Sequence, residues 1–370
     1  MTDSNSQPRK IRVAVVFGGR SDEHDVSLRS ARTIMDALDS DRYEVVEIGI
    51  TRSGQWLAGE SPHAALVAES PMFHLTEGEQ TAVPDSSRDI RPVIGAEALL
   101  PQQAANGIDI FFPALHGPMG EDGTIQGMLE MAGVPYVGSG VLGSAVGMDK
   151  AMTKVILEQA GVPQLPWVLI TRREWQLNPD EVIARIERAL PYPVFVKPAN
   201  MGSSVGVSKA KNSDDLRTAL QEAAHFDRRV VVEQGVTGRE LEMGVLGNDA
   251  PITSGLGEIK PRAEFYDYAS KYLDDSADLI IPADVDPEIQ KEMERIAIES
   301  FIALDLAGLA RVDFFLEDGT NQIYLNEVNT LPGFTSISMY PMLWQQAGIA
   351  LPELVNRLVE LALERHAHKR

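Results

Sequence analysis

The chain has 370 residues, of which 44% are hydrophobic and none is cysteine, and its formal net charge is −21. This length predicts two or three domains with full cores. The absence of cysteine excludes a disulfide framework, a thiolate nucleophile and a cysteine-ligated metal, and fits a cytoplasmic protein. The negative charge argues against nucleic acid or an anionic membrane as a partner, so a bound anion such as ATP would need locally placed lysines.

The first residues of the chain indicate no membrane or export segment. Residues 1–10 are polar, lack the apolar stretch of a secretory signal and predict a disordered tail. No apolar run in the chain is long enough to span a bilayer. Residues 11–19, 25–38 and 43–50 then predict a buried strand, a helix and a second strand. This β–α–β order predicts ligand contacts at the carboxyl ends of the strands, but the loop lacks the G-x-G-x-x-G spacing of a nicotinamide dinucleotide site.

Two polar residues follow strands of this first domain, which is expected to span residues 11–140. Glu23 lies where the glycine loop enters the helix, a place where an acidic residue also simply favours the helix dipole. Residues 108–117 predict a buried strand with His116 near its end, where a lone histidine is usually structural. Residues 60–105 mix Ser, Pro, Glu and Gly with short apolar pieces, which predicts surface loops in an irregular insertion.

A second α+β unit is expected over residues 141–244. It opens with a helix at 142–159. A strand at 194–198 ends near Lys197, and because lysines are rarely buried, a nearly buried lysine there indicates a specific role. The glycine–serine loop at 200–206 has many backbone N–H groups that could wrap phosphates. It lacks the lysine and the following helix of a P-loop, and by itself an ordinary mobile hairpin is the simpler interpretation.

The third unit, residues 245–370, contains the pattern with the clearest chemistry. Residues 311–333 predict a β-hairpin in which Asp313 lies across from Glu327, with Asn329 next along. Two like charges in that position repel, so a cation is expected between them, and oxygen ligands suit Mg²⁺ or Mn²⁺. A solvated polar face on an edge hairpin is the alternative, which the flanking aromatic and branched residues disfavour.

The remaining segments of the third unit predict a lid and three helices. Residues 260–280 combine aromatic residues and charges of both signs with little periodicity, which is typical of a functional lid. Residues 287–304, 334–348 and 351–366 predict helices.

Short motifs follow one another in a defined order along the chain. A glycine loop with Glu23 is followed by ALHG, GEDGT, MDK, VKP, GSSVG, VEQ, KY, RVDF and NEVNTLPGFTSIS. With these motifs, residues 11–362 resemble the D-alanine–D-alanine ligases, members of the ATP-grasp superfamily. The resemblance implies an α/β protein: an N-terminal Rossmann-like parallel sheet domain, then a two-subdomain ATP-grasp fold with antiparallel sheets, α+β in that part. It implies ATP-dependent ligation of two D-alanine molecules through a D-alanyl phosphate, in the cytoplasm, for peptidoglycan precursor synthesis.

The resemblance also assigns nucleotide contacts. The phosphates of ATP are expected at Lys150 and Lys197. Ser203 and Ser204 are expected in the loop that closes over the phosphates. The remaining nucleotide contacts implied by the resemblance, mainly to adenine and ribose, are Glu233, Gln234, Val236, Glu240, Lys271 and Asn326. Some family members have Lys in place of Gln234.

The resemblance further implies the metal and substrate residues. Two Mg²⁺ or Mn²⁺ ions are expected at Asp313, Glu327 and Asn329. The substrate residues are Glu23, for the ammonium of the first D-alanine, and His116, Arg311, Gly333, Ser338 and Met339. Arg311 and the Gly333 N–H would stabilise the tetrahedral oxyanion, and a hydrogen-bonded chain would run from Tyr272 through Ser203 to Glu23. The catalytic set is therefore Glu23, Ser203, Tyr272, Arg311 and Ser338, and a homodimer is expected.

Three other functions remain open from the sequence. A D-alanine–D-lactate ligase has the same fold, but such enzymes tend to carry Phe where this chain has Tyr272. Another ATP-grasp ligase or a carboxylase is disfavoured by the Glu23 loop and the TLPGFTSIS segment. A nucleotide-binding regulatory protein without turnover would be expected to lose a metal ligand, and all three ligands are present.

Overall fold

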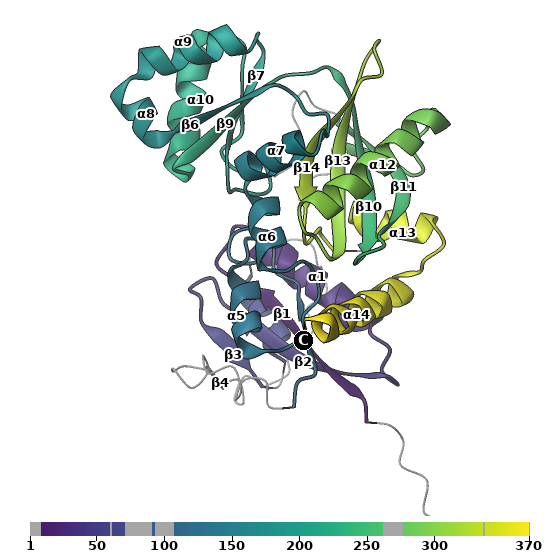
Figure 1. The fold of residues 1–370 in the computed structure, drawn as a ribbon. Coiled ribbons are helices and arrows are strands. Elements are labelled where there is room, and N and C mark those ends of the chain that lie inside the picture. Colours follow the sequence, from purple (N-terminus) through teal and green to yellow (C-terminus); the bar gives the residue numbers. More distant parts are fainter. Residues whose placement is uncertain are drawn as a thin grey trace, which may run out of the picture.

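The structure is a computed structural model that describes residues 9–59, 61–70, 91–92, 107–261, 277–335 and 337–369. Three sheets organise these residues (Figure 1). Residues 1–8 of the predicted N-terminal tail and most of the predicted insertion lie outside the described residues, as do Lys271 and Tyr272 with most of the predicted lid. Within the described part of the chain, no helix is both long enough and apolar enough to cross a bilayer.

The N-terminal sheet has the strand order β4–β3–β2–β1–β5, and its strands β1, β2 and β5 are parallel. This arrangement confirms the predicted β–α–β start and the Rossmann-like parallel sheet. Helix α2 lies in the segment predicted as irregular loops, where its eight residues are too few for a clear helical period. The elements of this unit are β1 (Ile11–Gly18), α1 (His24–Ala37), β2 (Tyr43–Ile50), β3 (Trp56–Ala58), α2 (Pro62–Glu69), β4 (Arg91–Pro92), β5 (Ile110–Pro113) and α5 (Thr124–Ala132).

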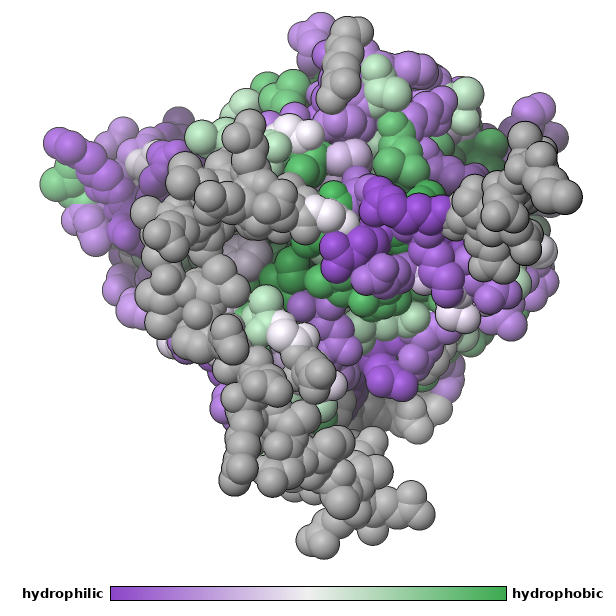
Figure 2. Space-filling model, turned by 90° about the horizontal axis from the view of Figure 1, so that it is seen from below, coloured by the Kyte–Doolittle hydropathy of each residue, from purple (hydrophilic) through white to green (hydrophobic). Residues whose placement is uncertain are grey.

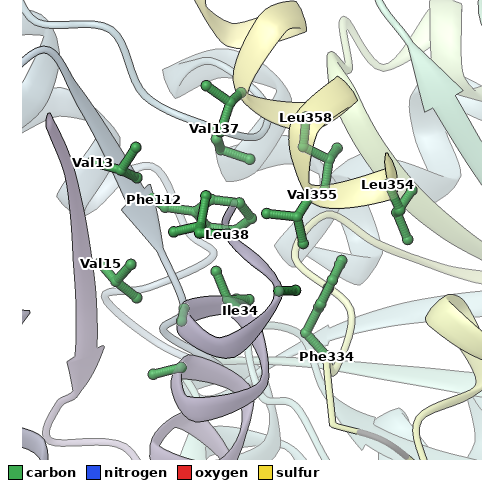
Figure 3. Packing of buried hydrophobic residues seen from close by; sticks show 14 of the residues in the cluster. Val13, Val15, Ile34, Leu38, Phe112, Val137, Phe334, Leu354, Val355 and Leu358 are labelled. Atoms are coloured by element: carbon green, nitrogen blue, oxygen red, sulfur yellow. The ribbon is translucent and has the colours of Figure 1, made fainter. Parts of the chain in front are cut away.

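Helices cover both faces of this sheet, which explains why β1, an inner strand, is buried along most of its length. Val13 and Val15 of β1 point to the face that α1 covers, where Ile34 packs against them (Figure 3). Ala14 and Val16 point to the opposite face, which α5 covers. The last helix, α14 (Leu351–His368), packs with α1 and β5 on the first face. The C-terminal end of the chain therefore completes the core of the N-terminal unit.

The central unit is built on an antiparallel sheet of order β6–β9–β7–β8. The single helix predicted over 142–159 is wrong: two helices meet at Asp149, whose backbone is extended. Its side chain accepts a hydrogen bond from Met152 N, 3.0 Å, which caps the second helix, and pairs with Arg229. The elements of this unit are α6 (Val141–Met148), α7 (Lys150–Gln159), β6 (Trp167–Thr171), α8 (Arg172–Leu177), α9 (Pro179–Ala189), β7 (Val194–Pro198), β8 (Ser208–Ala210), α10 (Ser213–Phe226) and β9 (Arg229–Gln234).

The third sheet has the order β12–β11–β10–β13–β14 and is also antiparallel. The boundary expected between residues 244 and 245 falls inside β10, which pairs with β13 along its whole length. We therefore place the change of subdomain at residues 235–237, between β9 and β10. The elements are β10 (Gly238–Gly247), β11 (Ile252–Pro261), β12 (Ala277–Ile280), α12 (Pro287–Ala303), β13 (Gly308–Glu317), β14 (Ile323–Asn329) and α13 (Met339–Gln346), followed by α14.

The helix predicted from residue 334 begins only at Met339. A turn precedes it, in which Ser338 Oγ accepts a hydrogen bond from Thr335 N at 3.0 Å. Phe334 N donates instead to Ser30 Oγ of the N-terminal unit, 3.2 Å away. These hydrogen bonds outside a helix hold the start of the segment in a turn that joins two units.

Candidate active site

A cavity of about 370 Å³ lies between the central and third sheets. Its walls come from α7, the 200–206 loop, β7, β9 and β14. The structure brings together on these walls every predicted nucleotide-binding residue of its described part: Lys150, Lys197, Ser203, Ser204, Glu233, Gln234, Val236, Glu240 and Asn326. Glu327 and Asn329, two of the predicted metal ligands, line the same cavity.

Glu233 is the centre of a buried ion-pair cluster in this cavity. Lys154 Nζ lies 2.6 Å from its Oε1, and Lys197 Nζ contacts its Oε2. Burial would raise the pKa of Glu233, but the charges of the two lysines hold it at about 2. Burial would lower the pKa of Lys197, but Glu233 raises it above its usual value. At neutral pH Glu233 is therefore ionised and Lys197 protonated.

Lys154 is a site residue that the sequence prediction did not include. It lies four residues after Lys150 on α7, so the two side chains share one face of the helix. That spacing was the only feature of the sequence that could have assigned Lys154 to the site, since its partner Glu233 is 79 positions further along the chain.

The amino end of α7 holds the start of the 200–206 loop. Lys150 N donates to Ala199 O at 2.9 Å, and Lys150 Nζ donates to Met201 O at 2.8 Å. The same Nζ lies 3.8 Å from Glu327 Oε2 on β14. In the loop, Ser203 and Ser204 have the left-handed φ values of 48° and 59°, which are uncommon for residues other than glycine. Lys150 thus links the loop to the predicted metal ligands.

The hairpin of β13 and β14 has the register that the sequence predicts. Asp313 pairs with Glu327, and Arg311 pairs with Asn329. Arg311 Nε and one terminal nitrogen donate to the two oxygens of Asp313, each at 2.7 Å, and Asn329 Nδ2 donates to Asp313 Oδ2 at 2.9 Å. Charges of opposite sign beside both carboxylates offset the repulsion that two facing acids produce.

These residues fit a magnesium or manganese site. Among the described residues, no cluster of three or more His, Cys, Asp or Glu could hold a metal ion by itself. Asp313, Glu327 and Asn329 supply two carboxylates and one amide from one hairpin. Mg²⁺ commonly uses one or two carboxylates and takes its other ligands from water and phosphate. A metal at this hairpin would therefore depend on a phosphate-bearing ligand in the adjoining cavity.

Glu23 connects the N-terminal unit to the 200–206 loop. Ser203 Oγ donates a hydrogen bond to Glu23 Oε1, although the two residues are 180 positions apart in the chain. A β-carbon on Gly117, whose φ is +72°, would lie 2.5 Å from Glu23 Oε2. Glycine adopts this left-handed φ without strain and lets the carboxylate stay where it is. The predicted hydrogen-bonded chain is thus present from Ser203 to Glu23, and its third member, Tyr272, lies outside the described residues.

His116 is buried beside an acid that the sequence prediction did not include. One ring nitrogen, Nε2, lies 2.8 Å from Ser30 Oγ, and the other, Nδ1, lies 3.1 Å from Leu331 O and 3.5 Å from Glu121 Oε1. Burial would lower the pKa of His116, but its hydrogen bond with Glu121 raises it. Glu121 belongs to the GEDGT motif and lines the cavity. The GEDGT motif was the feature of the sequence that could have identified Glu121 as a site residue.

The remaining predicted substrate residues are Arg311, Gly333, Ser338 and Met339, and they have different neighbours. Arg311 also lies 2.9 Å from Glu242 Oε2, so two carboxylates hold its guanidinium. Gly333 lies against Ser338, because a β-carbon added to Gly333 would be 3.0 Å from Ser338 Oγ. Met339 is buried in an apolar cluster with Ile259 and Leu343 and does not line the cavity.

Two antiparallel sheets that enclose a lysine-lined cavity, behind a Rossmann-like domain, define an ATP-grasp fold. Solved structures share it over nearly the whole chain. The VanG D-Ala:D-Ser ligase from Enterococcus faecalis has a TM-score of 0.82 at 32% identity, over 96% of this chain and all of that one. The D-alanine–D-alanine ligase from Coxiella burnetii has a TM-score of 0.80 at 35% identity, over 97% and 96%.

Sequence comparison narrows this class to one family. Residues 12–139 match the family model described as the D-ala D-ala ligase N-terminus, and residues 156–360 match that of the C-terminus. A protein of Geobacillus thermodenitrificans with the name D-alanine–D-alanine ligase is 51% identical over 97% of both chains. One of Acetivibrio thermocellus with the same name is 47% identical over 96% of this chain and 97% of its own. The chain belongs to the D-alanine–D-alanine ligase family.

Proposed function

We propose that this enzyme joins two molecules of D-alanine into D-alanyl-D-alanine and converts ATP to ADP and phosphate. The observation that carries the proposal is that the Lys–Glu cluster and the Asp313–Glu327 hairpin meet at one cavity. Cationic lysines and a carboxylate pair are the groups that phosphoryl transfer from ATP requires. Relatives that are about half identical over nearly the whole chain have this activity in their names.

The first step is binding of ATP in the cavity. Lys150 and Lys197 bind the phosphates, and residues of β9 and β10, including Glu240, bind the adenine and ribose. Two Mg²⁺ or Mn²⁺ ions at the hairpin, when bound, would neutralise charge on the phosphate oxygens. Asp313 holds its orientation through Arg311 and Asn329, so that the ligands are in place before the nucleotide arrives.

The second step is attack on ATP by the first D-alanine. A carboxylate oxygen of D-alanine forms a bond to the γ-phosphorus while the bond from that phosphorus to ADP breaks, which yields D-alanyl phosphate. Glu23 holds the ammonium of this D-alanine, and His116 lies at its carboxyl side. Water would destroy the acyl phosphate, and we propose that the 200–206 loop excludes water; most of the predicted lid at 260–280 lies outside the described residues.

The third step forms the peptide bond. The amine of the second D-alanine attacks the acyl carbon, and the tetrahedral oxyanion that results receives hydrogen bonds from Arg311 and the Gly333 N–H. The bond from carbon to the phosphate oxygen then breaks, and phosphate leaves. Ser338, whose Oγ lies beside Gly333, is the residue that we propose binds the substrate carboxyl.

The same proposal includes a cytoplasmic location, where ATP is available, and a homodimer. Figure 2 shows hydrophobic residues near the middle of the face seen from below, among hydrophilic ones. Exposed apolar residues of α5 and α7, such as Met131 and Val155, are further candidates for a subunit contact. Light scattering of the purified protein tests the dimer.

Incubation of the protein with ATP, Mg²⁺ and D-alanine tests the function. The expected result is D-alanyl-D-alanine by mass, with one ADP and one phosphate released for each dipeptide. A control without D-alanine accounts for slow hydrolysis of ATP. If D-alanine yields ADP but no dipeptide, the second half of the mechanism is wrong, and if no ADP forms, the proposed function fails.

Tyr272 decides between D-alanine and D-lactate as the second substrate. We propose that its hydroxyl belongs to the network of Ser203 and Glu23, and removal of one hydroxyl from such a network costs ~0.5–1.5 kcal/mol, roughly a threefold to tenfold effect. Tyr272→Phe is expected to retain reduced dipeptide synthesis and to gain D-alanyl-D-lactate synthesis, most visibly at lower pH, where the amine is protonated. Competition between the two substrates across pH, with both products counted by mass, is the measurement. A product ratio equal to that of the wild type at every pH would assign Tyr272 a packing role only.

A further inference from the structure

We infer that Lys154 is a positioning residue for ATP: it occupies one oxygen of Glu233 and so leaves Lys197 a surplus of positive charge for the phosphates. The inference rests on the proposed function, because it assumes that phosphates bind at Lys197. It assigns a task to a buried lysine that takes no part in the steps described above.

Lys154 and Lys197 contact different oxygens of Glu233, which indicates different roles for the two lysines. The side chains of Lys154 and Glu233 are each only 4% exposed, and Lys154 Nζ lies 2.6 Å from Glu233 Oε1. Lys197 contacts the other oxygen, Oε2, and its Nζ also lies 3.3 Å from Asn326 Oδ1 on β14. Glu233 therefore lies between the two ammonium groups, and Lys197 is the one that reaches toward the strand that carries Glu327.

Charge balance gives this arrangement its effect. Within this cluster one carboxylate and two ammonium groups carry a net charge of +1, which offsets part of the negative charge of Glu327 and Glu240 near Lys197, whereas Glu233 and Lys197 alone would form a neutral pair. In that pair both oxygens of Glu233 would attract Lys197, and ATP would have to compete with them for the ammonium group. The surplus charge matters in a chain whose formal net charge is −21, where the surrounding field disfavours a polyanion.

A purely structural ion pair is the competing explanation, and nucleotides of different charge distinguish the two. Adenosine occupies the adenine and ribose part of the cavity but carries no phosphate. A lysine that sets the charge at Lys197 affects ATP and ADP much more than adenosine, because adenosine responds only to the change at Glu233. A lysine that only supports the wall of the cavity affects all three to the same degree.

The experiment is calorimetric titration of Lys154→Met with adenosine, ADP and ATP in the presence of Mg²⁺. Removal of one charge near the phosphates is expected to raise the Kd of ATP roughly tenfold or more, and that of adenosine by a clearly smaller factor. The KM for ATP rises accordingly, and the KM for D-alanine stays close to that of the wild type. Lys211→Met, which removes an exposed lysine after β8, is the matched control and leaves all three affinities unchanged.

Two outcomes would overturn the inference: an unchanged Kd for ATP, or equal weakening of adenosine and ATP. If Lys154→Met does not fold, as judged by its melting temperature, Lys154→Gln replaces it. Glutamine still donates a hydrogen bond to Glu233 but carries no charge, so the same selective loss of ATP is expected. If the wild type itself neither binds ATP nor releases ADP, the proposed function fails, and that result is distinct from a variant that matches an active wild type.

Discussion

Glu327→Gln is expected to abolish ligation and to leave the fold largely intact. The substitution replaces a negatively charged metal ligand with a neutral amide at the cavity wall, so charge on the transferring phosphoryl group is no longer neutralised. The free energy of unfolding is expected to change by no more than about 1 kcal/mol, because the loss of the Lys150 contact is offset by removal of the repulsion with Asp313.

Release of phosphate at saturating Mg²⁺, together with urea unfolding, measures both parts of this prediction. Glu317→Gln is the matched control, because Glu317 lies at the turn end of the same hairpin and does not line the cavity. It is expected to retain nearly full activity. Phosphate release by Glu327→Gln at a rate close to that of the wild type would contradict the metal assignment.

Lys197→Ala has the second largest expected effect, on both ATP binding and phosphoryl transfer. The variant loses the cation that reaches toward β14 and leaves Glu233 paired with Lys154 alone. Loss of a charged contact in a partly desolvated cavity corresponds to a reduction in ATP affinity on the order of a hundredfold. The rate of phosphoryl transfer is expected to fall as well, because that reaction depends on electrostatic stabilisation.

Calorimetric titration with ATP and single-turnover assays check this result. Lys209→Ala is the matched control: Lys209 lines the same cavity, but its Nζ lies over the ring of Phe195, 5.8 Å from the centroid. It is expected to have little effect. Equal losses in the two variants would mean that the lysines provide a diffuse positive field and that Lys197 is no specific phosphate ligand.

The sequence by itself determined the parts of this protein that depend on neighbours along the chain. Alternation of apolar residues, with turn residues between the two strands, was enough to predict the hairpin and the pairing of Asp313 with Glu327. An apolar run followed by a glycine-rich loop was enough to predict β1. The five consecutive residues VFVKP were enough to predict β7, which carries Lys197. Such patterns succeed because the period of side chains along a strand is a local property.

Only the tertiary structure decided the features that join distant residues. Asp149 divides a continuous helical pattern because its cap and its ion pair with Arg229 outweigh helix propensity. Helix α14 has an ordinary amphipathic pattern, which does not reveal that its apolar face covers the N-terminal sheet. The contacts of Glu233 with Lys154 and Lys197 follow from sheet order and helix placement. The local periodicity indicates which side of a helix or strand is buried, but only the tertiary packing determines which other elements cover that side.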